Sequence, residues 1–209
     1  MPMISRAETI LLETHVKGFT FLNPNIDANV RGTYLGLADP ATIAHIKEQG
    51  ITSVQLLPIA ACMHEPHLLE MGMVNYWGYN SLSFMAPDPR YAINDAVTEL
   101  KTTIRELHKN NIEVILDVVY NHTAEGGNGG CTFNLKGLDQ DYYLHHNGNY
   151  TNYTGCGNTL DITHQPSLNL IMDTLRYWVE HYHIDGFRFD LAATLGREYD
   201  QFNPHNAFF

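Results

Sequence analysis

The sequence is poor in positive charge and in cysteine. Its 209 residues carry 12 Lys and Arg against 23 Asp and Glu, which gives a formal charge of −11. No basic stripe is present, so we expect no binding to nucleic acid. The three cysteines, Cys62, Cys131 and Cys156, are scattered and odd in number. They do not indicate a disulfide framework, which favours a reducing compartment.

Long apolar runs are also missing. No segment is apolar for long enough to span a membrane. The stretch from Met1 to Arg6 lacks the charged start and apolar run of a secretory signal. We therefore expect a soluble, cytoplasmic protein with no membrane partner. Hydrophobic residues make up 44% and charged residues 17%, which is an ordinary composition for a folded domain.

Apolar runs and amphipathic segments alternate along the chain. Four short runs are typical of strands, and they cover residues 9–16, 53–59, 112–120 and 185–191. Three segments have the apolar spacing of helices, and they cover residues 39–50, 94–111 and 167–182. Asp39 before Pro40 predicts one helix start, and Asn94 is expected to cap the next. The alternating order predicts an α/β protein with a parallel sheet.

Long connections separate these elements. Residues 60–91 follow the second strand and residues 121–165 follow the third, so both lie at the carboxyl ends of strands, where α/β proteins place their sites. Gly126–Gly130 is the most flexible part of the second connection and predicts a mobile lid. We expect residues 17–36 to form a loop and the tail from Leu195 to begin another helix.

The last strand has a charged face. In Asp185–Leu191, Phe187, Phe189 and Leu191 alternate with Arg188 and Asp190. Charged groups are seldom buried unless they are paired. The face is therefore a solvent-facing edge, a structural ion pair or the wall of a catalytic pocket.

Other polar residues follow the third strand. Asp117 lies among apolar neighbours and needs a partner, for which Arg188 is a candidate, and Asn121 and His122 come shortly after it. His122 alone is more often a loop histidine with satisfied hydrogen bonds than a catalytic one. Because the carboxyl ends of parallel strands meet at one edge, we expect these groups and Asp190 to converge on one pocket.

Two motifs carry a resemblance to a known family. Asp117–Thr123 and Asp185–Ala192 resemble the first two signature regions of the α-amylase family of glycoside hydrolases, family 13. Further stretches resemble its debranching enzymes, of isoamylase and bacterial glycogen-debranching type, and these are residues 13–20, 75–80, 86–92, 122–126 and 155–160. The resemblance implies a partial (β/α)8 TIM barrel, with strands 1–4 and a long excursion after strand 3.

The resemblance also implies domains and missing parts. Residues 1–209 would be the first half of the catalytic barrel, with residues 123–165 as an excursion resembling the family's domain B. The family's acid/base Glu on the fifth strand, its second barrel half and its N-terminal carbohydrate-binding module have no counterpart in these residues. We therefore expect a fragment that is inactive and poorly soluble as an isolated chain, either as a truncated product or as an incomplete sequence.

Roles for single residues follow from the resemblance alone. Asp190 would be the nucleophile, Arg188 would orient it, and Asp117 would be a structural carboxylate. Four residues would contact substrate, and they are Tyr79, which would stack on the sugar ring, His122, Asn121 and Trp77. Loop packing is the alternative for the aromatic residues, and for Trp77 the two interpretations stand equal.

The implied activity is hydrolysis of α-1,6-glucosidic branch points in glycogen or a limit dextrin, with retention through a glycosyl-enzyme intermediate. The alternatives are a glucan-binding remnant without catalysis and a fragment of a transglycosylase of the same family. The partner is an α-glucan, and no protein partner is indicated. No cofactor is expected. Calcium stays open and unassigned, and Cys62-x-His64-x-x-His67 matches no standard metal site.

Overall fold

The computed structural model describes residues 1–198 and 201–209. Two compact units make up the chain. The first unit consists of Met1–Ala61, Met85–Asp117 and Tyr177–Arg188. The second unit consists of Cys62–Phe84, Val118–Arg176 and Phe189–Phe209. Each unit has its own core, so each is described by itself.

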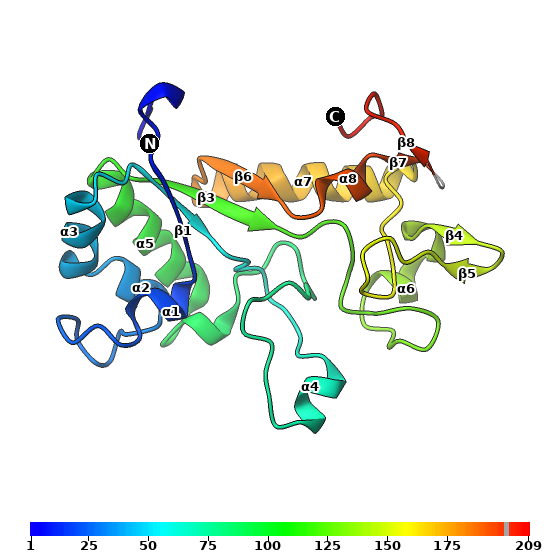
Figure 1. The fold of residues 1–209 in the computed structure, drawn as a ribbon, viewed down its shortest axis with the longest axis horizontal. Coiled ribbons are helices and arrows are strands. Elements are labelled where there is room, and N and C mark those ends of the chain that lie inside the picture. The colour runs from blue at the N-terminus through cyan, green and yellow to red at the C-terminus, as the bar shows by residue number, and fades with distance from the viewer. Residues whose placement is uncertain (199–200) are drawn as a thin grey trace. The chain divides into compact units, whose positions relative to one another are not determined.

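A four-stranded sheet forms most of the first unit's interior. Its strands are β1 Leu11–Thr14, β2 Ser53–Leu56, β3 Glu113–Val118 and β6 Gly186–Phe189. The strand order is β1-β2-β3-β6, and only the last residues of β3 and β6 belong to the second unit. β1 pairs with β2, and β2 with β3, in parallel (Figure 1). The predicted α/β fold with four parallel strands is confirmed.

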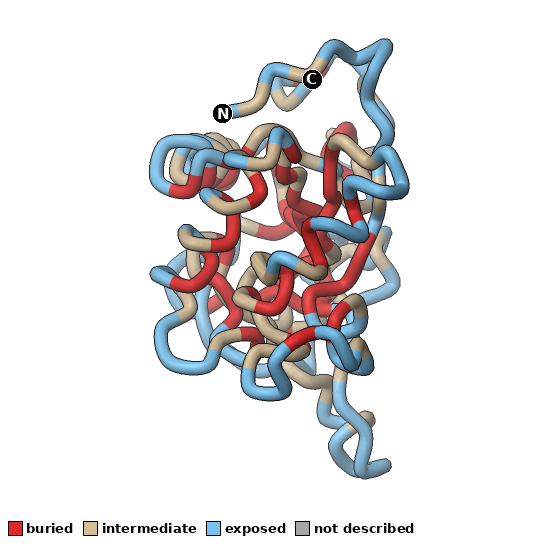
Figure 2. The backbone as a smooth tube through the Cα atoms, turned by 90° about the vertical axis from the view of Figure 1, so that its left-hand side faces the viewer, coloured by how far each residue is buried: buried red, intermediate tan, exposed pale blue. Residues whose placement is uncertain are grey.

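The central strands are covered on both faces. Every residue of β2 is buried, and so are most residues of β3. The polar residues of β2 are paired, since Ser53 Oγ donates to the Glu113 carboxylate and Gln55 Nε2 to the Glu13 carboxylate, both at 2.8 Å. Buried stretches of the backbone stand out in red in Figure 2. The largest core side chains of this unit include those of Leu56, Leu116, Leu100, Ile104, Leu107 and Trp178.

Four helices and two short 3-10 helices belong entirely to the first unit. They are α1 Val16–Thr20, α2 Tyr34–Leu37, α3 Pro40–Glu48, α5 Ala96–Lys109, η1 Arg6–Glu8 and η2 Pro89–Tyr91. Asp39 caps α3 as predicted, since its carboxylate accepts a hydrogen bond from the N–H of Ala41 at 2.8 Å. The cap of α5 is Asp95 instead of Asn94. The N–H of Asn94 donates to the buried Glu99 carboxylate at 2.7 Å, which leaves the next residue to cap the helix.

The predicted loop over residues 17–36 is wrong in part, because α1 and α2 lie in this segment. His15 caps α1, since its Nδ1 accepts hydrogen bonds from the N–H groups of Lys17 and Gly18 at 3.0 and 3.1 Å. The first strand accordingly ends at Thr14. Asp, Asn, Ser and Thr are the usual N-cap residues, so His gave no helix signal.

The second unit is built from short elements. Its helices are α4 Pro66–Glu70, α6 Leu135–Leu138, α8 Ala192–Leu195, η3 Gln140–Tyr142 and all but the last turns of α7 Gln165–Tyr182. It also contains two antiparallel strand pairs, and they are β4 His145–His146 with β5 Asn149–Tyr150 and β7 Arg197–Glu198 with β8 Gln201–Phe202. The helix expected from Leu195 is wrong for the described residues, which pair as β7 and β8, and residues 199–200 of this tail lie outside them.

One buried carboxylate organises the segment that follows β3. Glu125 accepts hydrogen bonds from the N–H groups of Phe133 and Asn134 at 2.8 Å, from the N–H of Lys136 at 3.1 Å and from the Tyr143 hydroxyl. The ammonium of Lys136 donates to the Glu125 carbonyl at 2.8 Å. These contacts lie within residues 123–165, and the assignment of that range as a separate excursion domain stays a prediction.

Within the described residues, no helix has both the length and the apolar character needed to cross a bilayer.

Candidate active site

An ion pair between a buried carboxylate and a partly exposed guanidinium joins β3 and β6 in the first unit. Arg188 Nη1 donates to Asp117 Oδ1 at 2.9 Å and to Oδ2 at 3.1 Å. The Asp117 side chain is fully buried, whereas 43% of the Arg188 side chain is exposed. A buried carboxylate requires such a partner, and the guanidinium group satisfies both its oxygens. The pairing considered from the sequence is therefore present in the structure.

A second polar group lies in the second unit and contains Asp190. The amide nitrogen of Asn121 donates to the Asp190 carboxylate at 3.0 Å and to the Asp190 carbonyl at 2.9 Å. The N–H of Asp190 donates to the carbonyl of Val118 at 3.0 Å. Asn121 is completely buried and Asp190 is half-buried. The backbone and the carboxylate of Asp190 are thus held by the last residue of β3 and by Asn121 after it.

His122 continues this network. Its Nδ1 lies 2.5 Å from Asn121 Oδ1, and its Nε2 lies 3.0 Å from the carbonyl oxygen of Tyr79. Burial lowers the pKa of His122, while the Tyr79 carbonyl and the negative charge of Asp190 partly oppose that effect. The imidazole is therefore held between two protein oxygens, and burial disfavours its charged form.

The aromatic loop of residues 75–80 lies in the same unit. Asn75 Oδ1 accepts a hydrogen bond from the N–H of Gly78 at 2.8 Å, and Gly78 has a φ of 89°, a conformation that glycine adopts without strain. Trp77 and Tyr79 meet edge to face with ring centroids 6.3 Å apart. Trp77 is 64% exposed and Tyr79 is half-buried, so both rings present surface to solvent. Their stacking on sugar stays a prediction.

The predicted site residues thus fall into two groups. Asp117 and Arg188 pair in the first unit, and the remaining five lie in the second. Asn121 was expected to contact substrate. Its observed partners are protein groups, since it contacts Asp190 and His122, and the sequence did not reveal this positioning contact. Glu125 was also missed as the organiser of its segment. A short polar motif predicts that a residue matters, but its hydrogen-bond partners depend on the tertiary fold.

The stretch with Cys62, His64 and His67 has an ordinary structural explanation. His64 Nδ1 accepts a hydrogen bond from the N–H of Asn75 at 3.0 Å and so supports the aromatic loop. Across residues 1–198 and 201–209, no group of three or more His, Cys, Asp or Glu side chains could hold a metal ion.

Comparison with known proteins identifies the family. The sequence profile described as "Alpha amylase, catalytic domain" matches residues 19–155. The chain belongs to this family. The resemblance based on the two strand-end motifs is thereby confirmed.

Curated relatives are similar over almost the whole chain. A "Glycogen operon protein GlgX homolog" of Haemophilus influenzae is 50% identical over 206 residues, which are 97% of this chain and 31% of that protein. A "Glycogen debranching enzyme" of Erwinia tasmaniensis is 48% identical over 94% of this chain and 30% of that protein. The chain therefore spans less than a third of the length of these relatives.

Solved structures are similar as well. A pullulanase of Paenibacillus barengoltzii in complex with maltotetraose has a TM-score of 0.79 and 30% identity over 92% of this chain and 32% of that chain. A type I pullulanase of Bacillus subtilis in complex with maltose has a TM-score of 0.76 and 30% identity over 92% of this chain and 28% of that chain. The parallel strands observed here are those of the first half of a (β/α)8 barrel.

Proposed function

We propose that this chain supplies the nucleophile of a retaining α-glucan hydrolase that cleaves α-1,6 branch points. The observation that carries the proposal is the half-buried Asp190 carboxylate, which Asn121 holds at the carboxyl end of β6. A nucleophile must be fixed and ionised but still reachable. A hydrogen bond from an amide anchors a carboxylate without neutralising its charge.

The chemistry follows from that carboxylate. An oxygen of Asp190 forms a bond to the anomeric carbon while the bond to the leaving oxygen breaks, and an acid group gives that oxygen a proton. Water then attacks the glycosyl ester, a base removes its proton, and Asp190 is regenerated. The two steps need two carboxyl groups about 5–5.5 Å apart in retaining enzymes, and they need no cofactor.

We propose supporting roles for the other residues of the site. Arg188 stands two positions before Asp190 in the sequence, and we propose that it orients the nucleophile while Asp117 fixes the guanidinium. His122 would hydrogen-bond the sugar, and a sugar hydroxyl would then share or replace one of the two protein oxygens on its ring nitrogens. Tyr79 would stack on the apolar face of that sugar, with Trp77 beside it.

The choice of substrate rests on the relatives. Two of them are named glycogen debranching enzymes, and pullulanases were solved with maltotetraose, maltohexaose, α-cyclodextrin or maltose. An α-glucan is the chemistry common to these names. The α-1,6 linkage is the finer part of the proposal.

An activated donor tests the nucleophile without an acid group. Fluoride leaves α-maltosyl fluoride without being protonated, so the chain should release a burst of about one fluoride per molecule as the glycosyl ester forms. Asp190→Asn should remove the burst, whereas Asp173→Asn, at an exposed helix position, should keep it. A burst that survives Asp190→Asn would disprove the assignment, and binding of maltose without a burst would favour a binding module.

Natural substrate gives the complementary test. We propose that the isolated chain does not turn over a branched glucan, because its natural leaving group needs a proton donor and no residue is assigned that role. The measurement is the release of reducing ends from glycogen or a limit dextrin. Turnover that Asp190→Asn abolishes would overturn this part of the proposal.

A further inference from the structure

One face of α5 carries a row of positive charge. Lys101, Arg105 and Lys109 follow one another at intervals of four residues, which places them along a single stripe of the helix. The whole chain contains 12 Lys and Arg and has a formal charge of −11. A quarter of its fixed positive charge therefore lies on one helical stripe.

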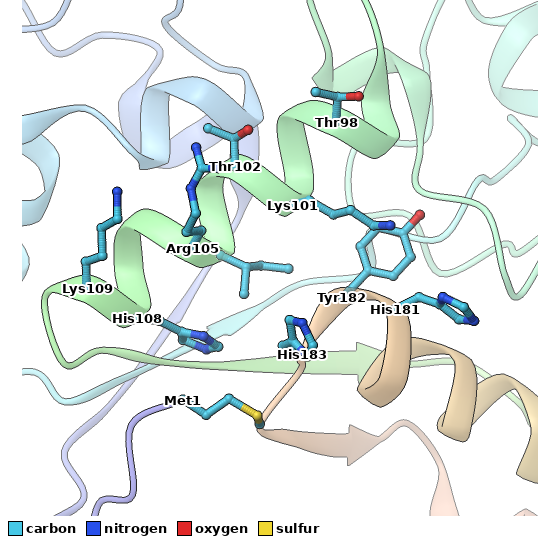
Figure 3. Close-up of a pocket in the computed structure, with 11 residues that line it drawn as sticks. Met1, Thr98, Lys101, Thr102, Arg105, His108, Lys109, His181, Tyr182 and His183 are labelled. Atoms are coloured by element: carbon cyan, nitrogen blue, oxygen red, sulfur yellow. The ribbon is translucent and has the colours of Figure 1, made fainter.

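This stripe forms one wall of a cleft in the first unit. The cleft has a volume of about 750 Å³, and the end of α7 with the residues after it forms the opposite wall. His181, Tyr182 and His183 come from that side, and His108 joins the cationic stripe (Figure 3). Thr98 and Thr102 add hydroxyl groups, and no Asp or Glu is among the lining residues.

Three acidic residues adjoin the cleft from outside, and they are Glu106, Asp185 and Asp95, whose Oδ2 accepts a hydrogen bond from the N–H of Thr98 at 2.8 Å. Glu106 accepts a hydrogen bond from Lys109 Nζ at 2.8 Å and a weaker one from Arg105 Nε at 3.4 Å. The side chains of Arg105 and Lys109 are 63% and 60% exposed, so these pairs are solvated and weak. His108 Nε2 lies 2.7 Å from Asp185 Oδ2. The stripe keeps a positive excess, because its three cations adjoin one carboxylate on α5.

The wall formed by the end of α7 holds one of the three cations of the stripe in place. The ammonium of Lys101 lies 5.0 Å from the centroid of the Tyr182 ring, a cation–π distance that keeps this charge at the wall. Tyr182 itself is only 1% exposed, so the cleft offers little aromatic surface for stacking on a sugar. His183 has a φ of 60°, a backbone conformation that fixes the turn between α7 and β6.

We propose that this cleft binds the phosphoryl group of a phosphate ester. Guanidinium, ammonium, imidazole and hydroxyl groups are the donors that recognise phosphate oxygens. A neutral glucan would lack the aromatic platform it needs, and a long polyanion would meet the negative charge of the rest of the chain. A small dianion fits the volume and the local charge. The proposal is independent of hydrolysis at Asp190.

The phosphoryl group has two possible sources, which are a free sugar phosphate and a phosphate ester carried on a glucan. Isothermal titration at constant ionic strength separates them, with glucose 6-phosphate, phosphorylated glucan, unphosphorylated glucan and glucose as the four ligands. We expect glucose 6-phosphate to bind and glucose not to bind. Binding of the phosphorylated glucan alone would assign the polymer as the source.

Two matched double variants test the location. Arg105→Gln with Lys109→Gln removes two charges from the cleft, and the affinity for the phosphate ester should fall about tenfold or more. Lys47→Gln with Arg176→Gln removes two exposed charges elsewhere and should leave the affinity within about twofold. A similar loss in both variants would show that only the overall charge matters, and would overturn the proposal.

A third variant separates loss of binding from loss of folding. His183→Asn keeps a residue that tolerates the left-handed backbone and removes one imidazole, so it should weaken binding about threefold with an unchanged circular dichroism spectrum. The proposal would also be overturned if neither glucose 6-phosphate nor the phosphorylated glucan bound better than its unphosphorylated counterpart, or if His183→Asn and the cleft double variant left the affinity unchanged.

Discussion

Asn121 is the residue that connects the motif after β3 to Asp190. Its side chain is completely buried, and both of its polar atoms have protein partners, which are Asp190 and His122. The sequence predicted that Asn121, His122 and Asp190 matter together. It could not predict the direction of the hydrogen bonds, because those depend on how the segments after two separate strands meet.

Replacing Asn121 should therefore destabilise the fold as well as the site. Asn121→Ala removes the amide donor to the carbonyl and the carboxylate of the half-buried Asp190. We expect the free energy of unfolding to fall by about 1.5–3 kcal/mol, the range for hydrogen bonds to charged groups. Urea denaturation measures this, and Asn169→Ala, at an exposed position of α7, should change it by less than about 0.5 kcal/mol. Equal effects in both variants would contradict the positioning role.

Glu125 organises the element that follows β3. Burial opposes ionisation of its carboxyl group, but hydrogen bonds from Tyr143 and from the N–H groups of Asn134, Phe133 and Lys136 outweigh burial, so its pKa is lowered. The sequence placed Glu125 in a family motif and gave it no role. Its four hydrogen-bond donors come from residues 133–143, and no local sequence pattern predicts that they meet at the Glu125 carboxylate.

Acid should loosen this segment. Since the folded pKa of Glu125 lies below its unfolded value, its contribution is fully present above the unfolded pKa, about 4.3, and is lost as the pH falls through the folded pKa. Glu125→Gln should lower stability at pH 7 and make stability between pH 5 and pH 3 less dependent on pH than in the wild type. Urea midpoints across this range provide the measurement. Parallel pH curves for the two proteins would show that the carboxylate is not the anchor.

The strands of the sheet were predictable from the sequence, whereas the short helices and the short paired strands were not. All four strands of the sheet were expected, since continuous apolar runs between amphipathic helices are typical of parallel sheets. The short helices α1 and α2 were missed, because four or five residues show too little periodicity and His15 is an unusual cap. The pairing of β7 with β8 was missed for the same reason.

At the scale of the whole molecule, the sheet has open edges. Among the described residues, β1 pairs only with β2 and β6 only with β3. Leu11 on β1 is 49% exposed. An exposed apolar edge strand is a template for pairing with another chain.

The isolated chain should therefore self-associate through β1. Leu11→Lys places a charge on that edge and should shift the chain toward monomer in light scattering at equal concentration. Leu69→Lys, at a position that is 55% exposed on α4, is the matched control and should have a much smaller effect. If both substitutions shifted the chain toward monomer equally, added charge alone would explain the effect, and association through β1 would be contradicted.

The account as a whole depends on Asp190 as the nucleophile. The most direct measurement is peptide mass mapping after incubation with a 5-fluoro-α-glucosyl fluoride, whose ester with the enzyme hydrolyses slowly. We predict one added glycosyl mass on the peptide that contains Asp190, and none in Asp190→Asn. A glycosyl mass on another carboxylate, or no adduct on a folded chain that binds maltose, would contradict the account.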